Sequence, residues 1–325
     1  MVLDTQIFAG SAAEGGNAAR AAEDLAGCLR RVAAEVRAGK GASVVEAIIP
    51  DLARIRATVS KEDWVHHLVP QCRFHELAKL CSEDPYTERA LSKPRGFAGD
   101  AVMLDFLYSG APPSETSEIG REIFKGTALC TSGLSVVDRR DRLATLIQET
   151  AARKPGARGL SIACGHLREA QVDGGAAVQE FSAFYGLDQD AQALQVVEAE
   201  QAEFGVETVK GSVREVIGER IGFEQLDLVY AAGLLDYLSD GVAGRLIKRM
   251  ASFLAPGGRL VVGNFTPGNW GRLYMDVFMD WGLTYRTPED LRAIARDSGA
   301  TVGMAIERVS VDPYGNIAYL ELVRA

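Results

Sequence analysis

The sequence has no long hydrophobic run, few histidines and no paired cysteines. No stretch approaches the roughly eighteen consecutive apolar residues of a transmembrane helix, so we expect no membrane span. The five cysteines are scattered without a CxxC pair, and the four histidines show no HxxxH spacing. These absences argue against a disulfide framework and against a metal site.

Basic residues are also in the minority. The net charge is −9, and residues 1–150 and 151–325 each carry more acidic than basic side chains. A nucleic-acid-binding surface needs a basic excess, so we expect a small-molecule or acyl partner and no nucleic acid. The first residues contain Asp4 and no basic region before an apolar block, so we expect no secretory signal and a cytoplasmic protein. The composition leaves the oligomeric state open.

The 325 residues show two different periodicities. Residues 1–153 are helical in pattern, with apolar residues every three to four positions, as in Ala18–Gly39. Ser60 followed by Asp63 resembles a capping box and predicts the start of a further helix. A Lys-Pro-Gly sequence then breaks the pattern. We therefore expect an N-terminal helical domain over residues 1–153 and a second domain over residues 154–325.

The second half alternates short apolar runs with helical stretches. The predicted strands are Leu160–Cys164, Phe181–Leu187, Val206–Val209, Leu226–Ala232 and Arg259–Phe265. Such strands indicate a parallel sheet covered on both faces. Two final runs, Ala300–Ser310 and Asn316–Val323, are joined by only five residues, too few for a crossover helix, so they must form an antiparallel hairpin. This α/β pattern predicts the Rossmann-like sheet of class I methyltransferases.

The first predicted strand leads directly into a glycine turn. Ala163, Cys164 and Gly165 end the strand, and a helix-compatible stretch follows, so a cofactor can approach bare backbone there. Asp188 ends the next apolar run, 23 residues beyond Gly165, a spacing that suits an acid binding ribose hydroxyls. A single glycine in place of GxGxxG favours a nucleoside carrying an amino acid over a dinucleotide. The predicted cofactor is S-adenosylmethionine (SAM), with Gln189 beside Asp188 in its site.

The ends of the third and fourth predicted strands complete the expected cofactor site. The third strand is followed by small or polar residues, which this type of fold places beside adenine. Small residues at the end of the fourth strand leave space where a ligand crosses the sheet. The predicted contacts at these two ends are Gly211, Ser212, Val213, Ala231, Ala232 and Gly233.

A dense charged segment, DPYTERALSKPRGFAGD (Asp84–Asp100), interrupts the helical half. Within it, Arg95 stands between Pro94 and Gly96, and its planar guanidinium suits the cofactor's carboxylate. The alternative is a solvated loop with a surface salt bridge. We expect the segment to order over the cofactor, so that the helical domain acts as a lid.

Four polar side chains are candidates for positioning a methyl acceptor. They are Tyr86 in the charged segment, Asp236 and Tyr237 after the fourth strand, and Asn264 at the end of the fifth strand. An oxygen acceptor needs a base, whereas a carboxylate needs only positioning, and none of the four is marked as a base by its sequence context. Capping, packing and turn formation are the alternative roles.

Four segments carry a family resemblance: SKPRGFAGD, SIACGHLREAQ, LVYAAGLLDYLSD with LAPGGRLVVGNF, and YMDVFMDWGLTYRTPEDL. Together, over about residues 74–325, the chain resembles class I SAM-dependent methyltransferases related to the extracellular-factor enzymes that make 3-hydroxypalmitate methyl ester. The resemblance implies methyl transfer to an oxygen or carboxylate of a small-molecule or acyl acceptor in secondary metabolism. NFTPGN departs from the group, which more often has His or another polar residue before the proline, and this leaves the acceptor pocket open.

Two other functions stay open on the sequence alone. Similar folds can turn the amino group of SAM onto its own chain, forming azetidine-2-carboxylate and releasing methylthioadenosine. Aromatic side chains that suit a cation in either reaction are Tyr86, Tyr185, Tyr237, Trp281 and Tyr285. The third function is a non-catalytic SAM-binding interaction protein.

Overall fold

The computed structural model describes residues 7–325, with side chains from residue 17 onward. The chain divides into two compact units, which we name the helical unit and the sheet unit. Of the described residues, 7–133 and 270–282 form the helical unit, and 134–269 and 283–325 form the sheet unit. The chain therefore passes from one unit to the other three times.

This division differs from the expected boundary after residue 153. Helix α9 (Thr131–Arg153) belongs almost wholly to the sheet unit. Its side chains bond to the C-terminal hairpin there: Asn316 Nδ2 donates to Ser135 Oγ at 3.0 Å, and Arg142 Nη2 donates to Ser310 Oγ at 3.0 Å. Residues 270–282, by contrast, join the helical unit. Helical periodicity identifies a helix but not the element against which it packs.

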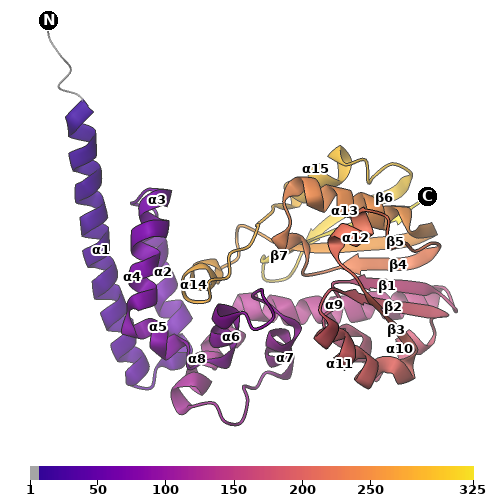
Figure 1. Cartoon of the computed structure of the whole chain (residues 1–325), viewed down its shortest axis with the longest axis horizontal. Coiled ribbons are helices and arrows are strands. Elements are labelled where there is room, and N and C mark those ends of the chain that lie inside the picture. Colours follow the sequence, from indigo (N-terminus) through magenta and orange to yellow (C-terminus); the bar gives the residue numbers. More distant parts are fainter. Residues whose placement is uncertain (1–6) are drawn as a thin grey trace, which may run out of the picture. The chain divides into compact units, whose positions relative to one another are not determined.

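The helical unit is built from α-helices and short helical turns (Figure 1). Its α-helices are α1 (Ile7–Arg37), α2 (Val44–Arg56), α3 (Lys61–Asp63), α4 (Val69–Phe74), α5 (Glu76–Cys81), α6 (Pro85–Ser92), α7 (Ala101–Ser109), α8 (Glu118–Ala128) and α14 (Arg272–Phe278). The predicted cap is confirmed, because Ser60 Oγ accepts a hydrogen bond from Asp63 N at 3.0 Å. Ser60 thereby satisfies a backbone N–H that the first turn of α3 leaves without a partner.

Polar contacts anchor α14 and the residues after it within the helical unit. The Tyr274 hydroxyl lies 3.1 Å from Thr87 Oγ1, and both side chains are buried. Arg73 donates to two carbonyl oxygens of α14 and to the Asp280 carboxylate, which also accepts a hydrogen bond from Lys93 Nζ. The acids and aromatics of this segment therefore have structural partners in the helical unit.

The sheet unit contains one seven-stranded sheet in the order β3-β2-β1-β4-β5-β7-β6. Its strands are β1 (Arg158–Ile162), β2 (Ala183–Asp188), β3 (Val206–Lys210), β4 (Leu226–Ala231), β5 (Leu254–Phe265), β6 (Met304–Val311) and β7 (Ile317–Arg324). Strands β1 to β5 are parallel, whereas β7 is antiparallel to both β5 and β6. The predicted parallel sheet and C-terminal hairpin are confirmed. The strand order reverses between β1 and β4, which is the topological switch point where such sheets bind ligands.

Helices cover both faces of this sheet. Figure 1 shows α12 (Val213–Ile217), α13 (Asp240–Ser252) and α15 (Pro288–Asp297) on one side, with α9 and α11 (Ala191–Gln201) on the other. The single-turn helix α10 (Ala176–Gln179) precedes β2. A sheet covered in this way buries the apolar side chains of both faces.

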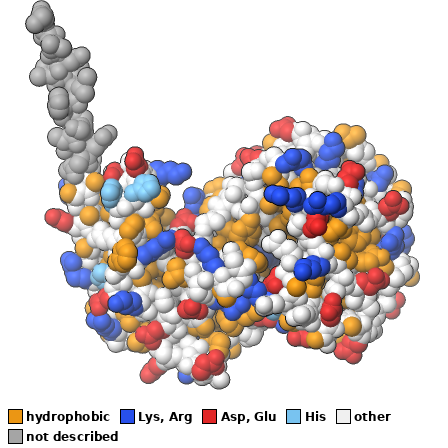
Figure 2. Space-filling model, viewed as in Figure 1, with side chains coloured by type: hydrophobic (Ala, Val, Ile, Leu, Met, Phe, Trp, Pro, Cys, Tyr) orange, Lys and Arg blue, Asp and Glu red, His pale blue; other side chains and the backbone are white. Residues whose placement is uncertain are grey.

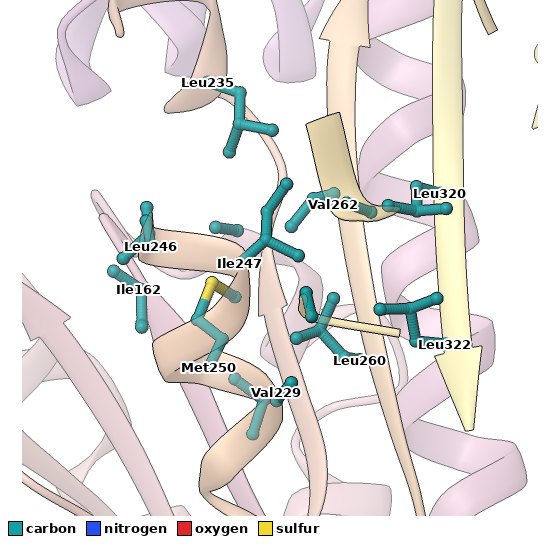
Figure 3. Packing of buried hydrophobic residues seen from close by; sticks show 14 of the residues in the cluster. Ile162, Val229, Leu235, Leu246, Ile247, Met250, Leu260, Val262, Leu320 and Leu322 are labelled. Carbon is teal, nitrogen blue, oxygen red and sulfur yellow. The ribbon is translucent and has the colours of Figure 1, made fainter. Parts of the chain in front are cut away.

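The main hydrophobic cluster lies between α13 and the sheet. Figure 3 shows side chains of α13 pointing toward those of β1, β4, β5 and β7. Because successive side chains of a strand point to opposite faces, Leu320 and Leu322 of β7 face this cluster, whereas Tyr319 and Glu321 face the other side. The face on which α9 packs therefore carries Tyr319 and Glu321 of β7, and the Arg142 guanidinium of α9 lies over the Tyr319 ring.

Positive and negative side chains are interspersed over the face shown in Figure 2. None of the helices from residue 7 onward combines the length and the apolar composition that crossing a membrane requires. Within the described part of the chain, no group of three or more His, Cys, Asp or Glu side chains is arranged to hold a metal ion.

Candidate functional site

Most of the predicted cofactor residues meet at one edge of the sheet. They end or follow strands β1 to β4: Ala163, Cys164, Gly165, Asp188, Gln189, Gly211, Ser212, Val213, Ala231, Ala232 and Gly233. Parallel strands end on the same side of a sheet, so residues distant in the sequence become neighbours there. This edge includes the switch point between β1 and β4.

The loop after β1 has a strained backbone. Ala163, Gly165 and Leu167 have φ angles of 56°, 55° and 50°. A left-handed conformation is easy for glycine but costs about 1–2 kcal/mol for other residues. The surrounding structure holds the loop in place, for example through the Cys164 N–H, which donates to the Leu187 carbonyl at 3.1 Å. Backbone strain of this kind concentrates at functional sites.

Asp188 is joined to this loop through its carboxylate. Gly165 N donates to Oδ2 at 2.9 Å, and Asp190 N donates to Oδ1 at 2.8 Å. The Asp188 carbonyl also accepts a hydrogen bond from Gly211 N at 2.9 Å, which adds the end of β3. The side chain is buried, and burial raises the pKa of Asp188 while the two backbone N–H groups oppose that rise. Each carboxylate oxygen keeps capacity for a second hydrogen bond, which suits two neighbouring hydroxyls.

The predicted contacts at the end of β3 also have structural roles. A Cβ atom on Gly211 would lie 2.2 Å from Ile221 Cδ1, so packing alone accounts for this glycine. Ser212 and Glu215 form a capping box at the start of α12: Ser212 Oγ accepts from Glu215 N, and the Glu215 carboxylate accepts from Ser212 N. Their contact with adenine stays a prediction.

The loop residues differ in how far they face solvent. Ala163 and Gln189 are exposed, whereas Gly165 and Val213 are half-buried. Cys164 is buried, and burial with the nearby carboxylates raises the pKa of its thiol well above the ordinary value. A thiol held in the protonated form is a poor nucleophile, which agrees with a packing role at the strand end.

The structure places a guanidinium at the switch point that sequence analysis did not identify. Arg139 of α9 is 6% exposed, and its Nη1 donates to the Ala232 carbonyl at 3.3 Å. A Cβ atom on Gly233 would lie only 3.1 Å from the same Nη1, so this glycine makes room for the guanidinium. The positive charge of Arg139 acts on the carboxyls of Asp236 and Glu169, which places both acids in its neighbourhood.

A signal for Arg139 exists in the sequence. It lies three residues after Val136 and four before Leu143, both of which are buried, so it falls on the inward stripe of α9. The run Arg139–Arg142, RRDR, nevertheless has the composition of a solvated helix face. The charged composition of this run therefore predicts an exposed Arg139, whereas the helical periodicity predicts a buried one.

Sequence analysis also missed the pairing of a half-buried acid, Glu169, with a buried phenol, Tyr230. The Tyr230 hydroxyl, at the end of β4, donates to Glu169 Oε1 at 2.8 Å. Burial raises the pKa of Tyr230 well above its ordinary value, so the phenol remains the donor. Burial also raises the pKa of Glu169, while the Tyr230 hydroxyl and the Arg139 charge oppose that rise. A carboxyl group thus lies close to Arg139 at the switch point.

Asn264, predicted to position an acceptor, lies in a buried network. Its Nδ2 donates to the carbonyls of Phe265 and Thr284 at 2.8 and 2.9 Å, and its Oδ1 accepts from Arg286 Nη1 at 2.7 Å. Arg286 is 2% exposed and also binds the Asp240 carboxylate at 2.8 Å. Both ends of the Asn264 amide are engaged, which favours a structural role that joins the end of β5 to the segment before α15.

Asp236 differs from Asn264 in that one of its side-chain oxygens remains available for a hydrogen bond. Its Oδ1 accepts a hydrogen bond from Phe265 N at 2.7 Å, and no hydrogen bond to Oδ2 occurs in the described part of the sheet unit. Burial raises the pKa of Asp236 to about 6, although Arg139 and Arg286 oppose the rise. A carboxyl group that titrates near neutrality at the end of a central strand is suited to proton transfer.

The remaining predicted residues are Tyr86, Arg95 and Tyr237. Tyr86 and Arg95 belong to the helical unit. Tyr86 is buried and packs edge-on against Trp281, with ring centroids 6.4 Å apart, and Arg95 is half-buried in the loop after α6. Tyr237 is in the sheet unit and is 42% exposed. The roles of these residues in cofactor binding and acceptor positioning stay predictions.

No protein-family model matches the sequence, and a search of curated proteins gives no match. Among solved structures, a possible exported protein from Bordetella parapertussis is similar over 94% of this chain and 96% of its own, with a TM-score of 0.54 and 16% identity. Magnesium protoporphyrin IX methyltransferase from Synechocystis PCC 6803 with bound S-adenosylhomocysteine is similar over 58% of this chain and 85% of its own (TM-score 0.44, 17% identity). The S-adenosylmethionine-dependent methyltransferase SibL is similar over 85% and 77% (TM-score 0.46, 16% identity). The likeness to the Bordetella protein shows a shared fold.

The raised pKa of Asp236 predicts a pH-dependent stability. An unfolded Asp ionises near pH 3.8 but the folded one near pH 6, so the wild type loses stability from this group as the pH rises between those values. Asp236→Asn cannot ionise. Its free energy of unfolding relative to wild type should therefore rise by about 2 kcal/mol between pH 4.5 and 7. Urea denaturation across that range measures the difference, and a pH-independent difference would show that Asp236 titrates normally.

Proposed function

We propose that the sheet unit binds SAM at the carboxyl edge of its strands and that the protein transfers the methyl group to a small-molecule or acyl acceptor, at an oxygen or a carboxylate. The hydrogen bond from Gly165 N to Asp188 Oδ2 carries the proposal. It fixes a buried carboxylate beside a strained, partly exposed loop at the topological switch point.

The charges at this edge fit the polar parts of SAM. Asp188 presents two carboxylate oxygens to the ribose hydroxyls. Arg139 offers a planar guanidinium to the α-carboxylate of the methionine part. Glu169, held by the Tyr230 hydroxyl, offers a negative group to the α-ammonium. A dinucleotide would present a pyrophosphate in place of these groups, and the single glycine of the loop suits it poorly.

We propose Arg139 as a second candidate for the contact with the methionine carboxylate, beside the predicted Arg95. Arg139 is in the same unit as Asp188 and touches the backbone at the end of β4, whereas Arg95 belongs to the helical unit. Buried guanidiniums that bond to a backbone carbonyl are already oriented, so less side-chain entropy is lost when a ligand binds.

When bound, SAM supplies an electrophilic methyl group on its sulfonium. Transfer breaks the sulfur–carbon bond, forms an oxygen–carbon bond on the acceptor and leaves S-adenosylhomocysteine. An ionised carboxylate acceptor has no proton to lose, whereas a hydroxyl acceptor must give its proton to a base. The pKa of Asp236 is about 6, so its carboxylate is ionised at neutral pH and is the proposed proton acceptor for a hydroxyl substrate.

The products of SAM turnover test the reaction. We expect the purified protein to form S-adenosylhomocysteine when it is incubated with SAM and 3-hydroxypalmitate or palmitate, and to leave SAM intact without an acceptor. Chromatography with mass detection separates the adenosine products. Methylthioadenosine formed from SAM alone would contradict methyl transfer and support cyclisation to azetidine-2-carboxylate.

Replacement of Asp188 tests the binding site. Asp188→Ala removes two charge-assisted hydrogen bonds to the ribose and should weaken SAM binding by about 2–4 kcal/mol. Asp188→Asn should fall between this variant and wild type, because an amide oxygen still accepts a hydrogen bond. Asp297→Ala, at an exposed position of α15, is the matched control. Calorimetry that gives wild-type affinity for Asp188→Ala would disprove the assignment.

Replacement of Arg139 tests the contact with the carboxylate. Arg139→Gln should weaken binding of S-adenosylhomocysteine about ten- to a hundredfold, the range for a hydrogen bond to a charged group. Methylthioadenosine lacks that carboxylate and should bind the variant and wild type alike. An equal loss for both ligands would mean that Arg139 supports the fold of the edge. Arg140→Gln, one position along α9, is the control on the same helix.

A further inference from the structure

A cavity of about 580 Å³ lies at the opposite end of the strands of the sheet unit. It is lined by Arg158, Tyr185, Gly222, Phe223, Glu224, Arg249 and Ser252. Arg158 begins β1, Phe223 and Glu224 come just before β4, and Ser252 ends α13 before β5. The cavity is therefore at the amino-terminal edge, away from Gly165 and Asp188. Tyr185 belongs to it and not to an aromatic set around the cofactor edge.

Two guanidiniums line this cavity, and the exposed Glu224 is the acidic residue among the lining residues. The Arg158 guanidinium donates to the Glu224 carbonyl at 2.6 Å and to the Tyr185 hydroxyl at 3.4 Å, and it has no ion pair with a described carboxylate within 4.0 Å. The backbone N–H of Arg158 donates to the Asp227 carboxylate at 3.0 Å. The nearest carboxylate to Arg249 is that of Glu219 at 3.9 Å, and the Glu219 side chain is 74% exposed. In a chain of net charge −9, two arginines against one lining glutamate give this cavity a local excess of positive charge.

Some arginines elsewhere in the same unit lie closer to a carboxylate. Arg259 lies 2.7 Å from a carboxylate oxygen of Glu149 and 3.0 Å from one of Glu321. Arg286 lies 2.8 Å from the Asp240 carboxylate. Arg142 and Arg324 of the sheet unit also have no ion pair with a described carboxylate within 4.0 Å, so Arg158 and Arg249 are distinguished by lining one cavity together.

Two aromatic side chains, Tyr185 and Phe223, also line the cavity, and Phe253 packs behind Phe223. The ring centroids of Tyr185 and Phe223 are 5.1 Å apart, and those of Phe223 and Phe253 are 5.7 Å apart. The Arg249 guanidinium lies over the Phe253 ring, 4.8 Å from its centroid. Its Nε is buried without a hydrogen-bond partner among the residues that the structure describes. A Cβ atom on Gly222 would lie 3.2 Å from Arg249 Nη2, so the absence of a side chain there keeps this end of the guanidinium uncovered.

We propose that this cavity binds a small organic anion, with its carboxylate or phosphate at the two guanidiniums and a planar body against Tyr185 and Phe223. The volume is in the usual range for small-molecule sites. The carboxyl end of α13 offsets part of the Arg249 charge, so Arg158 is the stronger anchor. The site lies outside the cofactor edge and does not depend on the proposed function.

Calorimetric titration of the full chain with benzoate, phenyl phosphate and inorganic phosphate tests this proposal. Wild type should give saturable binding of benzoate, phenyl phosphate or both, and which of the two binds more tightly identifies the anionic group. Arg158→Gln should weaken binding about tenfold or more, and Arg249→Gln by a smaller factor. Arg245→Gln, on the exposed face of the same helix α13, and Asp188→Asn at the cofactor edge should bind like wild type.

Two results would overturn the proposal. One is the absence of saturable binding of all three probes to wild type at millimolar concentrations. The other is equal affinity of wild type, Arg158→Gln and Arg249→Gln. The variants Arg158→Lys and Arg249→Lys keep the charge, so they should retain more binding than the Gln variants if the anion is recognised. Thermal melting of each variant separates a loss of the site from a loss of the fold.

Discussion

The hydrogen bond between Gly165 N and Asp188 Oδ2 is the contact on which the candidate site depends. It joins the ends of two neighbouring parallel strands, β1 and β2, and the Asp188 carbonyl adds the end of β3 through Gly211. The bond forms only because the parallel register places Ile162 opposite Leu187. The strained loop after β1 thereby holds the Asp188 carboxylate in a fixed position. Arg139 and Glu169 supply the other charged groups at this edge.

Buried guanidiniums fix the remaining parts of this edge. Arg139 reaches the end of β4 from α9, and Arg286 joins Asn264 at the end of β5 to backbone carbonyls of the segment that follows β4. Both side chains come from outside the strands. A guanidinium carries five donors in one plane, so a single residue can hold several loops in place. The geometry of the edge is therefore set by hydrogen bonds between residues far apart in the sequence as much as by the pairing of the strands.

Local patterns predicted the architecture of the sheet unit well. Apolar runs located the strands, and the five-residue connection required the antiparallel hairpin, because both inferences use only neighbouring residues. The cap at Ser60 was predicted for the same reason. The assignment of α9 and of residues 270–282 to their units was not, because it depends on partners such as Ser310 and Arg73 that lie far away in the sequence.

The sequence by itself determined the order of helices and strands, the glycine turn and the acid at the end of the second strand. Tertiary structure decided which polar groups became buried and which partners they found. Asn264 was predicted to position a methyl acceptor, but its amide oxygen is engaged by Arg286. Arg139 has the sequence context of a solvated helix face, but it bonds to the backbone at the switch point. Arg158 and Arg249 are 91 positions apart in the chain and line the same cavity. The physical reason is that secondary structure follows from local periodicity, whereas burial and pairing of charges depend on contacts that only the packed fold creates.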